Sequence, residues 1–343
     1  MKCRTLVALL MLVTAMTLAP LPVAGQGNPI EREAWSPPKT PWGAPDLQGT
    51  WSNTTTTPLE RPSDLADTEF LPAEEHAVRD QEVALSLNLD NPNSTTGAKT
   101  KGRVVGYNNF WLERGRLSAR TSLVVDPPDG RLPPITPKEQ ALQSRGHSST
   151  FAGGRFDSVE DFNALDRCIS RGMPGAMMPG FYNHNYQILQ TPTHVVILVE
   201  MVHDARIIPM DGRSHLTPTV KQWLGDARGH WEGNTLVVET ANFTDKVNGR
   251  QELGHTLGGG TVFGGDENLR LVERFTRISD DAIDYEFTVV DPTVWTEPWT
   301  ASLPMSAIDG PLFEYACHEG NYALGNILAG ARAEEHAGQS SSK

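Results

Sequence analysis

The stretch LRLVERFTRISDDAIDYEFTVVD, from Leu269 to Asp291, decides the class of the fold. Two runs rich in Val, Ile, Thr, Tyr and Phe flank the pair Asp280 and Asp281. Such runs are typical of strands, and paired aspartates are typical of tight turns. The stretch therefore predicts a β-hairpin, whose two strands pair in the antiparallel direction.

Similar runs fill the second half of the chain: YQILQ, HVVILVEMV, ARIIPM and NTLVVETANF. The stretch GHWEGNTL supplies a second hairpin turn. Six or more hairpin-linked strands tend to curl into a barrel or a sandwich. The sequence therefore predicts a mainly β fold, an antiparallel barrel or curled sheet over residues 180–321. A C-terminal helix from Tyr322 to Glu335 and a disordered polar tail complete the chain over residues 322–343.

Residues 26–179 form a proline-rich region, in which ordered loops, turns and short helices are expected to wrap the barrel and cover its edges. One helix is predicted from Pro72 to Leu87, where Pro and two glutamates begin the pattern. A second should begin at Thr136–Pro137. A third is predicted from the capping box at Ser158–Asp161 to Gly172.

Residues 1–25 have the pattern of a secretory signal peptide. Lys2 and Arg4 precede an apolar run that ends in the small-residue stretch Val23-Ala24-Gly25. A membrane anchor is the alternative, but prolines interrupt the run and its length is marginal for crossing a bilayer. We therefore expect a periplasmic or secreted protein with no membrane association after cleavage.

The chain of 343 residues carries a formal net charge of −13, which becomes about −15 once Lys2 and Arg4 are removed. So acidic a surface repels phosphate backbones and anionic lipid, and this argues against nucleic-acid and membrane partners. Solubility outside the cell is the simpler explanation of the charge and the one we prefer. The expected partner is a small-molecule ligand, and the oligomeric state stays open.

Outside the predicted signal peptide only Cys168 and Cys317 remain of the three cysteines. A lone pair in an oxidising compartment usually forms a disulfide bridge. A catalytic thiol or a metal thiolate is the alternative, but no C-x-x-C or Cys/His spacing supports it.

Because these metal-binding spacings are missing, and because the chain also lacks dinucleotide and phosphate-loop motifs, no metal and no cofactor are expected. The glycine-rich stretch from Thr256 to Gly265 is interpreted as a mobile loop, with a lid as an alternative.

Six motifs in one order carry a resemblance over nearly the whole mature chain: TPWGAPDLQGTWSNTTTTPLERP, DRCISRGMPG, YNHNYQILQTPTHVVILVEMVHDARIIPMDGR, QWLGDARGHWEGNTLVVETANF, LVERFTRI and FEYACHEGNY. With these motifs the chain resembles a large uncharacterised family of exported bacterial proteins. The resemblance implies export. It carries over no activity, because no catalytic residues are established for this family. DLQGTW is also similar to the Gly-x-Trp at the first strand of lipocalin-like barrels.

The run from His194 to Arg206 holds the first candidate site. Read as one strand, it divides into two faces: His194, Val196, Leu198, Glu200, Val202, Asp204 and Arg206 on one, and Val195, Ile197, Val199, Met201, His203 and Ala205 on the other. Glu200 and Asp204 either pair with Arg206 on a solvated face or line a cavity where burial raises an acid's pKa. His203 is expected on the core face, as a hydrogen-bonded core histidine or as a base.

Three further stretches hold candidates: Tyr182, Asn183, His184, Asn185 and Tyr186 in GFYNHNYQ, Trp295 and Trp299 in VWTEPWT, and His318 in EYACHEGNY. The stretch GFYNHNYQ could bind a sugar or a polar ring, or it is a turn whose Asn side chains hydrogen-bond to their own backbone. The tryptophans either form a ligand platform or plug the open end of a barrel. His318 lies beside Cys317, at a site or at a simple structural bridge.

Three functions follow from these candidates. The first is a binding protein, whose barrel mouth holds a partly apolar or glycoside-like ligand. The second is a cofactor-independent hydrolase, lyase or isomerase that uses general acid–base chemistry. Its acids and bases would be Glu200, His203 and Asp204, with His184 or His318 as partner. The third is a structural envelope protein.

Overall fold

The predicted hairpin is present: strands β10 (Arg270–Ser279) and β11 (Ala282–Val290) pair antiparallel, and Phe275 faces Tyr285. We describe the chain from a computed structural model that covers residues 35–88, 109–143, 156–162, 164–247, 251–252, 262–263 and 267–341. The predicted signal peptide lies outside these residues, as does most of the glycine-rich stretch from Thr256 to Gly265.

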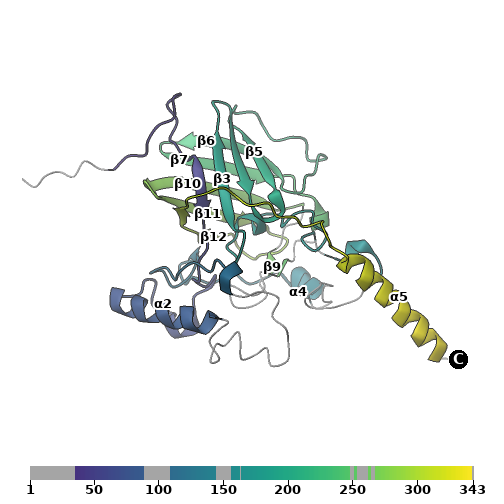
Figure 1. Cartoon of the computed structure of the whole chain (residues 1–343). Coiled ribbons are helices and arrows are strands. Elements are labelled where there is room, and N and C mark those ends of the chain that lie inside the picture. The colour runs from purple at the N-terminus through teal and green to yellow at the C-terminus, as the bar shows by residue number, and fades with distance from the viewer. Residues whose placement is uncertain are drawn as a thin grey trace, which may run out of the picture. The chain divides into compact units, whose positions relative to one another are not determined.

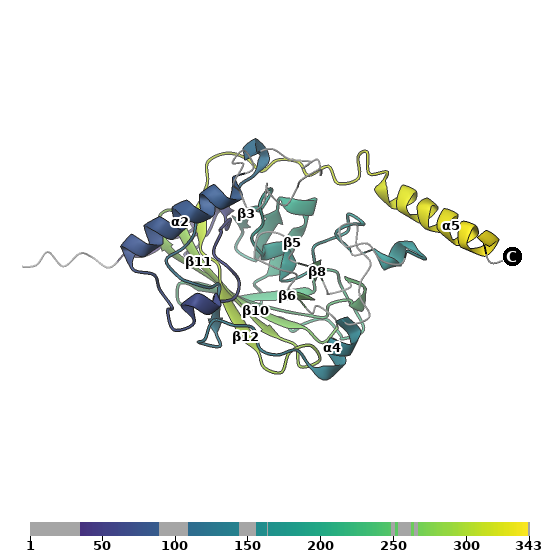
Figure 2. The same cartoon turned by 90° about the horizontal axis from the view of Figure 1, so that it is seen from below.

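The strands follow the order β5–β4–β3–β1–β13–β11–β10–β7–β6, and all neighbours in this order run antiparallel. The remaining bounds are β1 Gly49–Ser52, β3 Asn185–Gln190, β4 His194–Val199, β5 Ala205–Pro209, β6 Asp226–Glu232, β7 Thr235–Ala241 and β13 Met305–Ala307. The first and last strands, β5 and β6, contact each other. The sheet is therefore a nearly closed, barrel-like structure, and its strands curl around a shared interior (Figures 1 and 2). The predicted fold class is confirmed.

Two short strands extend the sheet beyond this path, since β12 (Trp299–Ser302) pairs with β11 and with β2 (Val124–Asp126). A separate pair is formed by β8 (Gln251–Glu252) and β9 (Val262–Phe263). Both predicted turns join neighbouring strands, β6 to β7 through Gly233 and β10 to β11 through the two aspartates. The proline-rich region contributes β1, which lies between β3 and β13 in the middle of the sheet.

Alternate side chains of each strand point inward and fill the interior. The buried set includes large side chains from several strands: Trp51, Tyr186, Phe275, Tyr285, Phe287, Trp299 and Met305. One ion pair lies among them, between Arg206 of β5 and Glu273 of β10. The Tyr285 hydroxyl donates to Glu273 Oε1 at 2.9 Å, so the carboxylate is bonded from two sides. Removing one member of such a pair leaves a buried charge without compensation, which is strongly destabilising.

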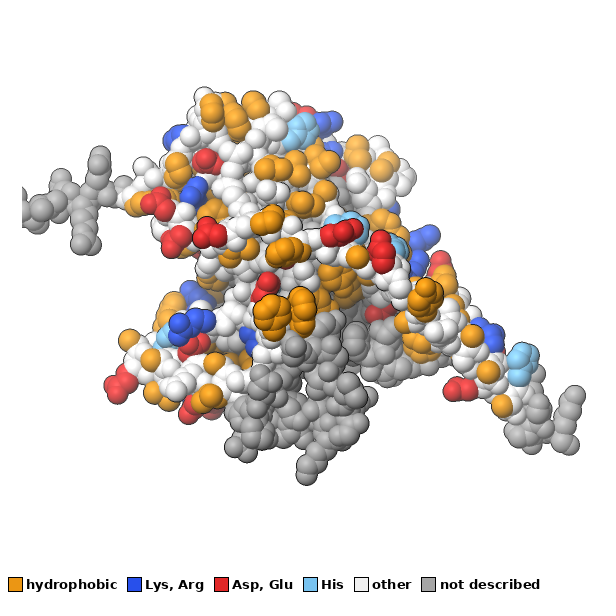
Figure 3. Space-filling model, viewed as in Figure 1, with side chains coloured by type: hydrophobic (Ala, Val, Ile, Leu, Met, Phe, Trp, Pro, Cys, Tyr) orange, Lys and Arg blue, Asp and Glu red, His pale blue; other side chains and the backbone are white. Residues whose placement is uncertain are grey.

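The outward face of β3, β4 and β5 is apolar in part. Leu189 and Ile207 are exposed there, and both lie opposite Val196 of β4 in the strand register. Apolar side chains gather over these strands in Figure 3.

The proline-rich region forms two of the three predicted helices. Helix α2 (Ala73–Leu87) and helix α4 (Pro137–Gln143) begin where they were expected. The capping box at Ser158 is also present, but it starts only a single 3-10 turn, Val159–Asp161, and the predicted helix to Gly172 is wrong. Phe162 and Ala164 are fully buried in this segment, and Cys168 has a positive φ of 55°.

The run from His194 to Arg206 forms two strands and a turn, not one strand. β4 ends at Val199, the 3-10 turn Met201–His203 follows, and β5 begins at Ala205. Val202 and His203 have positive φ values of 63° and 49°, which reverses the chain. The expected faces therefore fail beyond Val199: His203 is exposed, whereas Arg206 points into the interior.

Helix α5 (Ala323–Ser341) ends the described chain, so the tail expected to be disordered is helical to Ser341. The predicted disulfide between Cys168 and Cys317 is confirmed. Among the described residues no helix is long and apolar enough to cross a membrane.

Candidate functional site

One end of the sheet gathers most of the candidate residues. β3 begins there, β4 ends there and β5 begins there, because the three strands are antiparallel neighbours. The chain around Arg171 and the chain from Phe313 to Cys317 lie against this end, held by the disulfide. We call the following residues the sheet-end cluster: Ser170, Arg171, Tyr182, His184, Asn185, Tyr186, Glu200, Asp204 and Tyr315.

Arg171 and His184 are the centre of the cluster. The Arg171 guanidinium donates through Nη1 to His184 Nε2, and His184 Nδ1 bonds the carbonyl of Tyr182. Burial and then the charge of Arg171 hold the pKa of His184 well below its usual range. The ring is therefore neutral, with its proton on Nδ1, because Nε2 must accept from the guanidinium.

The tyrosines of the cluster lie near the same cation. Burial lowers the pKa of Arg171, and the tyrosines close enough to interact electrostatically with its guanidinium are Tyr186, Tyr182 and Tyr315. The Tyr186 hydroxyl donates to Asn53 Oδ1 at 3.3 Å, and burial raises the pKa of Tyr186. Tyr182 and Tyr315 are partly buried and pack on the core. The cluster therefore combines a cation with apolar ring surface.

The two acids of the cluster are held by the chain itself. Glu200 is buried and accepts from Asn185 Nδ2 and from the Phe313 N–H, both at 2.8 Å. Asp204 accepts from the Ser170 hydroxyl at 2.9 Å. Burial raises the pKa of Asp204, and the bond from Ser170 opposes this effect. Glu200 ties three segments together, and Asp204 is held by the residue that precedes Arg171 in the chain.

The other predicted residues lie apart from this centre. His203 is exposed and bonds the Tyr315 carbonyl through Nδ1 at 3.2 Å. Asn183 is half-buried with a positive φ of 52°, as a turn residue has. His318 is exposed next to the bridge. Arg206 serves the interior ion pair and not a solvated face.

Trp295 and Trp299 are in the core. Their rings pack edge to face with centroids 5.8 Å apart, and Trp299 packs on Phe287 in the same way at 5.5 Å. Trp299 is fully buried and Trp295 almost so. The plugging interpretation therefore describes both tryptophans better than a ligand platform does.

Arg171 was not among the candidates, although it lies in the motif DRCISRGMPG. The signal available in the sequence is an arginine followed by Gly172 and by a stretch without any acid up to Glu200. Its neighbours in space come from GFYNHNYQ and EYACHEGNY, so only the fold reveals its surroundings.

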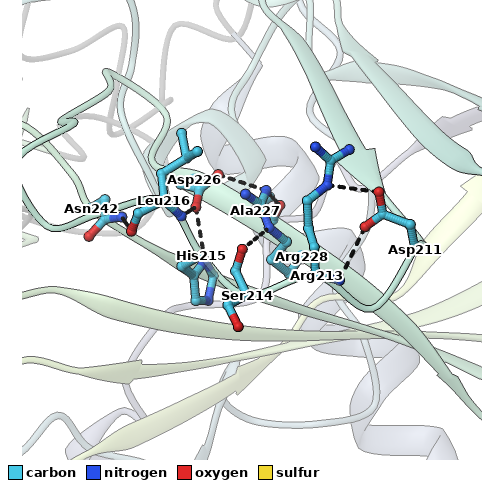
Figure 4. Close-up of polar contacts among 9 residues, drawn as sticks. All are labelled: Asp211, Arg213, Ser214, His215, Leu216, Asp226, Ala227, Arg228 and Asn242. Carbon is cyan, nitrogen blue, oxygen red and sulfur yellow. Dashed lines mark hydrogen bonds and ion pairs between the residues drawn. The ribbon is translucent and has the colours of Figure 1, made fainter.

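A second polar cluster, also absent from the predictions, joins the chain that connects β5 to β6 with the first residues of β6 (Figure 4). Asp226 is buried, and its Oδ2 accepts from the Leu216 N–H at 2.7 Å and contacts His215 Nδ1 at 3.2 Å. Its Oδ1 pairs with Arg228 Nη1 at 2.7 Å, and Arg228 Nε donates to the Ser214 carbonyl at 3.1 Å. The His215 side chain is 26% exposed. A buried carboxylate thus orients a histidine whose Nε2 has no partner within the described residues.

No group of three or more His, Cys, Asp or Glu side chains in the described chain has the arrangement of a metal site. None of the family models, curated proteins or solved structures compared with this chain matches it. The resemblance to exported bacterial proteins and to lipocalin-like barrels therefore stays a prediction.

Proposed function

We propose that this protein is exported and binds a small, partly apolar organic ligand at the sheet-end cluster. The observation that carries the proposal is the convergence of Arg171, His184 and three tyrosines at one end of the sheet. Ligand sites combine apolar and aromatic surface with a few oriented polar groups, and this cluster has that composition.

The position of the site follows from the interior of the sheet. The inward side chains of the described strands are buried and pack on one another. This supports a ligand site at the end of the barrel-like sheet, where Arg171, Tyr182 and Tyr315 keep intermediate exposure. Export is supported by the signal-peptide pattern and by the disulfide, since disulfides persist in oxidising compartments.

A thermal-shift screen of the mature protein tests the proposal. The compounds are sugars, aromatic glycosides, sterols, fatty acids and small aromatic acids. A ligand at a hundredfold excess over its Kd adds about 2.7 kcal/mol to the free energy of unfolding. We expect the shift to persist in Tyr322→Ala, at a tyrosine that is 77% exposed and outside the cluster, and to shrink in Tyr182→Ala.

Absence of a shift with every compound would contradict ligand binding and favour the structural role. An equal shift in native protein and Tyr182→Ala would place the ligand elsewhere.

The His215–Asp226 pair supports a second candidate function, catalysis by a general base. A buried aspartate on Nδ1 holds the imidazole in the tautomer that accepts a proton at Nε2, as the base of a hydrolase, lyase or isomerase needs. The screened compounds are incubated with native protein, His215→Asn and the control His230→Asn, and consumption is followed by NMR. Catalysis requires consumption by native protein and by the control but not by His215→Asn. Equal consumption by all three, or none by native protein, would contradict it.

A further inference from the structure

We infer that the ligand of the sheet-end cluster carries a carboxylate group and that the Arg171 guanidinium binds it. This inference rests on the proposed function, because it names the chemical class of ligand for the same site. It starts from a comparison of two arginines in the same molecule.

Arg206 and Arg171 differ in whether an acidic side chain compensates their positive charge. Arg206 is paired with the carboxylate of Glu273, so its charge is compensated inside the sheet. Arg171 has no acidic partner within the described residues, and its buried Nε has no hydrogen-bond acceptor there. Arg171 keeps intermediate exposure, but a charge that is partly withdrawn from water and has no counterion is unfavourable, and a guanidinium does not lose its proton in proteins. The charge of Arg171 therefore favours an anion beside it.

The neighbours of Arg171 leave most of its donors available. A guanidinium has five N–H donors, and the bond to His184 Nε2 uses one of them. His184 is neutral, so it fixes the direction of the guanidinium without compensating its charge. A planar guanidinium matches the two oxygens of a carboxylate, which gives a bidentate pair.

The surrounding charges select a monoanion. Arg171 supplies one positive charge, and two acids of the cluster lie close by. Asp204 accepts from Ser170, the chain neighbour of Arg171, and Glu200 accepts from Asn185, the chain neighbour of His184. A phosphate dianion would keep one uncompensated charge near these acids. Tyr182 and Tyr315 pack on the core beside the cation and suit an apolar carbon skeleton. Together these features fit an aromatic or short aliphatic carboxylic acid.

Matched pairs of compounds test the inference. Benzoate, phenylacetate and hexanoate are compared with their primary amides by titration calorimetry and thermal shift, with inorganic phosphate as a further probe. In native protein we expect each acid to bind at least tenfold more tightly than its amide, and more tightly than phosphate. Arg171→Met should abolish this preference and Arg171→Lys should reduce it. The control Arg213→Met, at an exposed arginine outside the cluster, should retain it.

The outcomes separate this inference from the proposed function. Equal binding of acids and amides in native protein, or an undiminished preference in Arg171→Met, would overturn the carboxylate assignment alone. Tighter binding of phosphate would overturn it in favour of another anion. Binding of neither acids nor amides nor any screened compound would overturn the ligand site itself.

Ligand-free Arg171→Met should unfold at no lower urea concentration than native protein, because it removes an uncompensated charge, and a clear loss of stability would contradict the account.

Discussion

His184 is a histidine that the fold keeps neutral. It is 4% exposed, its Nδ1 bonds the Tyr182 carbonyl, and the adjacent Arg171 opposes a second positive charge. Burial, followed by that charge, holds its pKa well below the usual value of 6.5. Below this pH the unfolded chain takes up a proton at this ring and the folded protein does not. Stability must therefore fall as the pH falls through about 6.5.

This linkage predicts the behaviour of His184→Gln, whose amide oxygen accepts from Arg171 and does not titrate. Native protein should lose up to about 1.4 kcal/mol per pH unit from this group below pH 6.5. The variant should show a flatter decline. Urea unfolding at pH 7.5 and 5.5 measures the difference, with His230→Gln, at an exposed histidine, as the control. Parallel losses in all three proteins would show that His184 is protonated in the folded state.

At the scale of single elements, the chain that leads into β3 packs closely against the His184 ring at Gly180, where a side chain would not fit. A Cβ atom at this position would lie 1.8 Å from His184 Cε1, so the ring or the chain would have to move. We expect Gly180→Ala to lower the free energy of unfolding by about 1–3 kcal/mol, as overpacking does. The same change at Gly330 in α5, where nothing lies within 4 Å, should not be destabilising. Equal effects of the two changes in urea unfolding would contradict the close packing at Gly180.

The elements also show where local sequence patterns stop being informative. The strands of the second half were predicted because β-branched and aromatic runs end at turn residues. The turn between β4 and β5 has no Gly or Pro, and Val202, a poor residue for positive φ, reverses the chain there. The cap at Ser158 formed as predicted, but burial of Phe162 and Ala164 directs the following chain into the core. Tertiary packing, which no local pattern contains, decided both places.

At the scale of the whole molecule, the disulfide joins residues 149 positions apart and holds the segment around Tyr315 at the sheet-end cluster. The double variant Cys168→Ser/Cys317→Ser should lose up to about 5 kcal/mol in the chain-entropy model. Urea unfolding of the variant, and of native protein with and without reductant, measures this loss. An unchanged midpoint in both comparisons would mean that the bridge contributes nothing to stability.

Long-range placement also limited what the sequence predicted of the site. Tyr182, His184 and Glu200 were candidates, and the fold brings them to one end of the sheet because β3 and β4 are paired. Arg171 was missed because its significance is the lack of an acidic neighbour, which only the folded chain reveals. The central position of β1 in the sheet could not be predicted either, because its partner strands lie more than a hundred residues away in the sequence.

Hydrogen–deuterium exchange tests the central claim, a ligand site at the end of the sheet, most directly. The native protein is compared with and without the compound that stabilises it most in the thermal-shift screen. We predict slower exchange in residues 170–186, 200–206 and 313–317, and unchanged exchange in residues 211–228 around His215. Protection confined to residues 211–228, or no protection of the three sheet-end segments, would contradict the account.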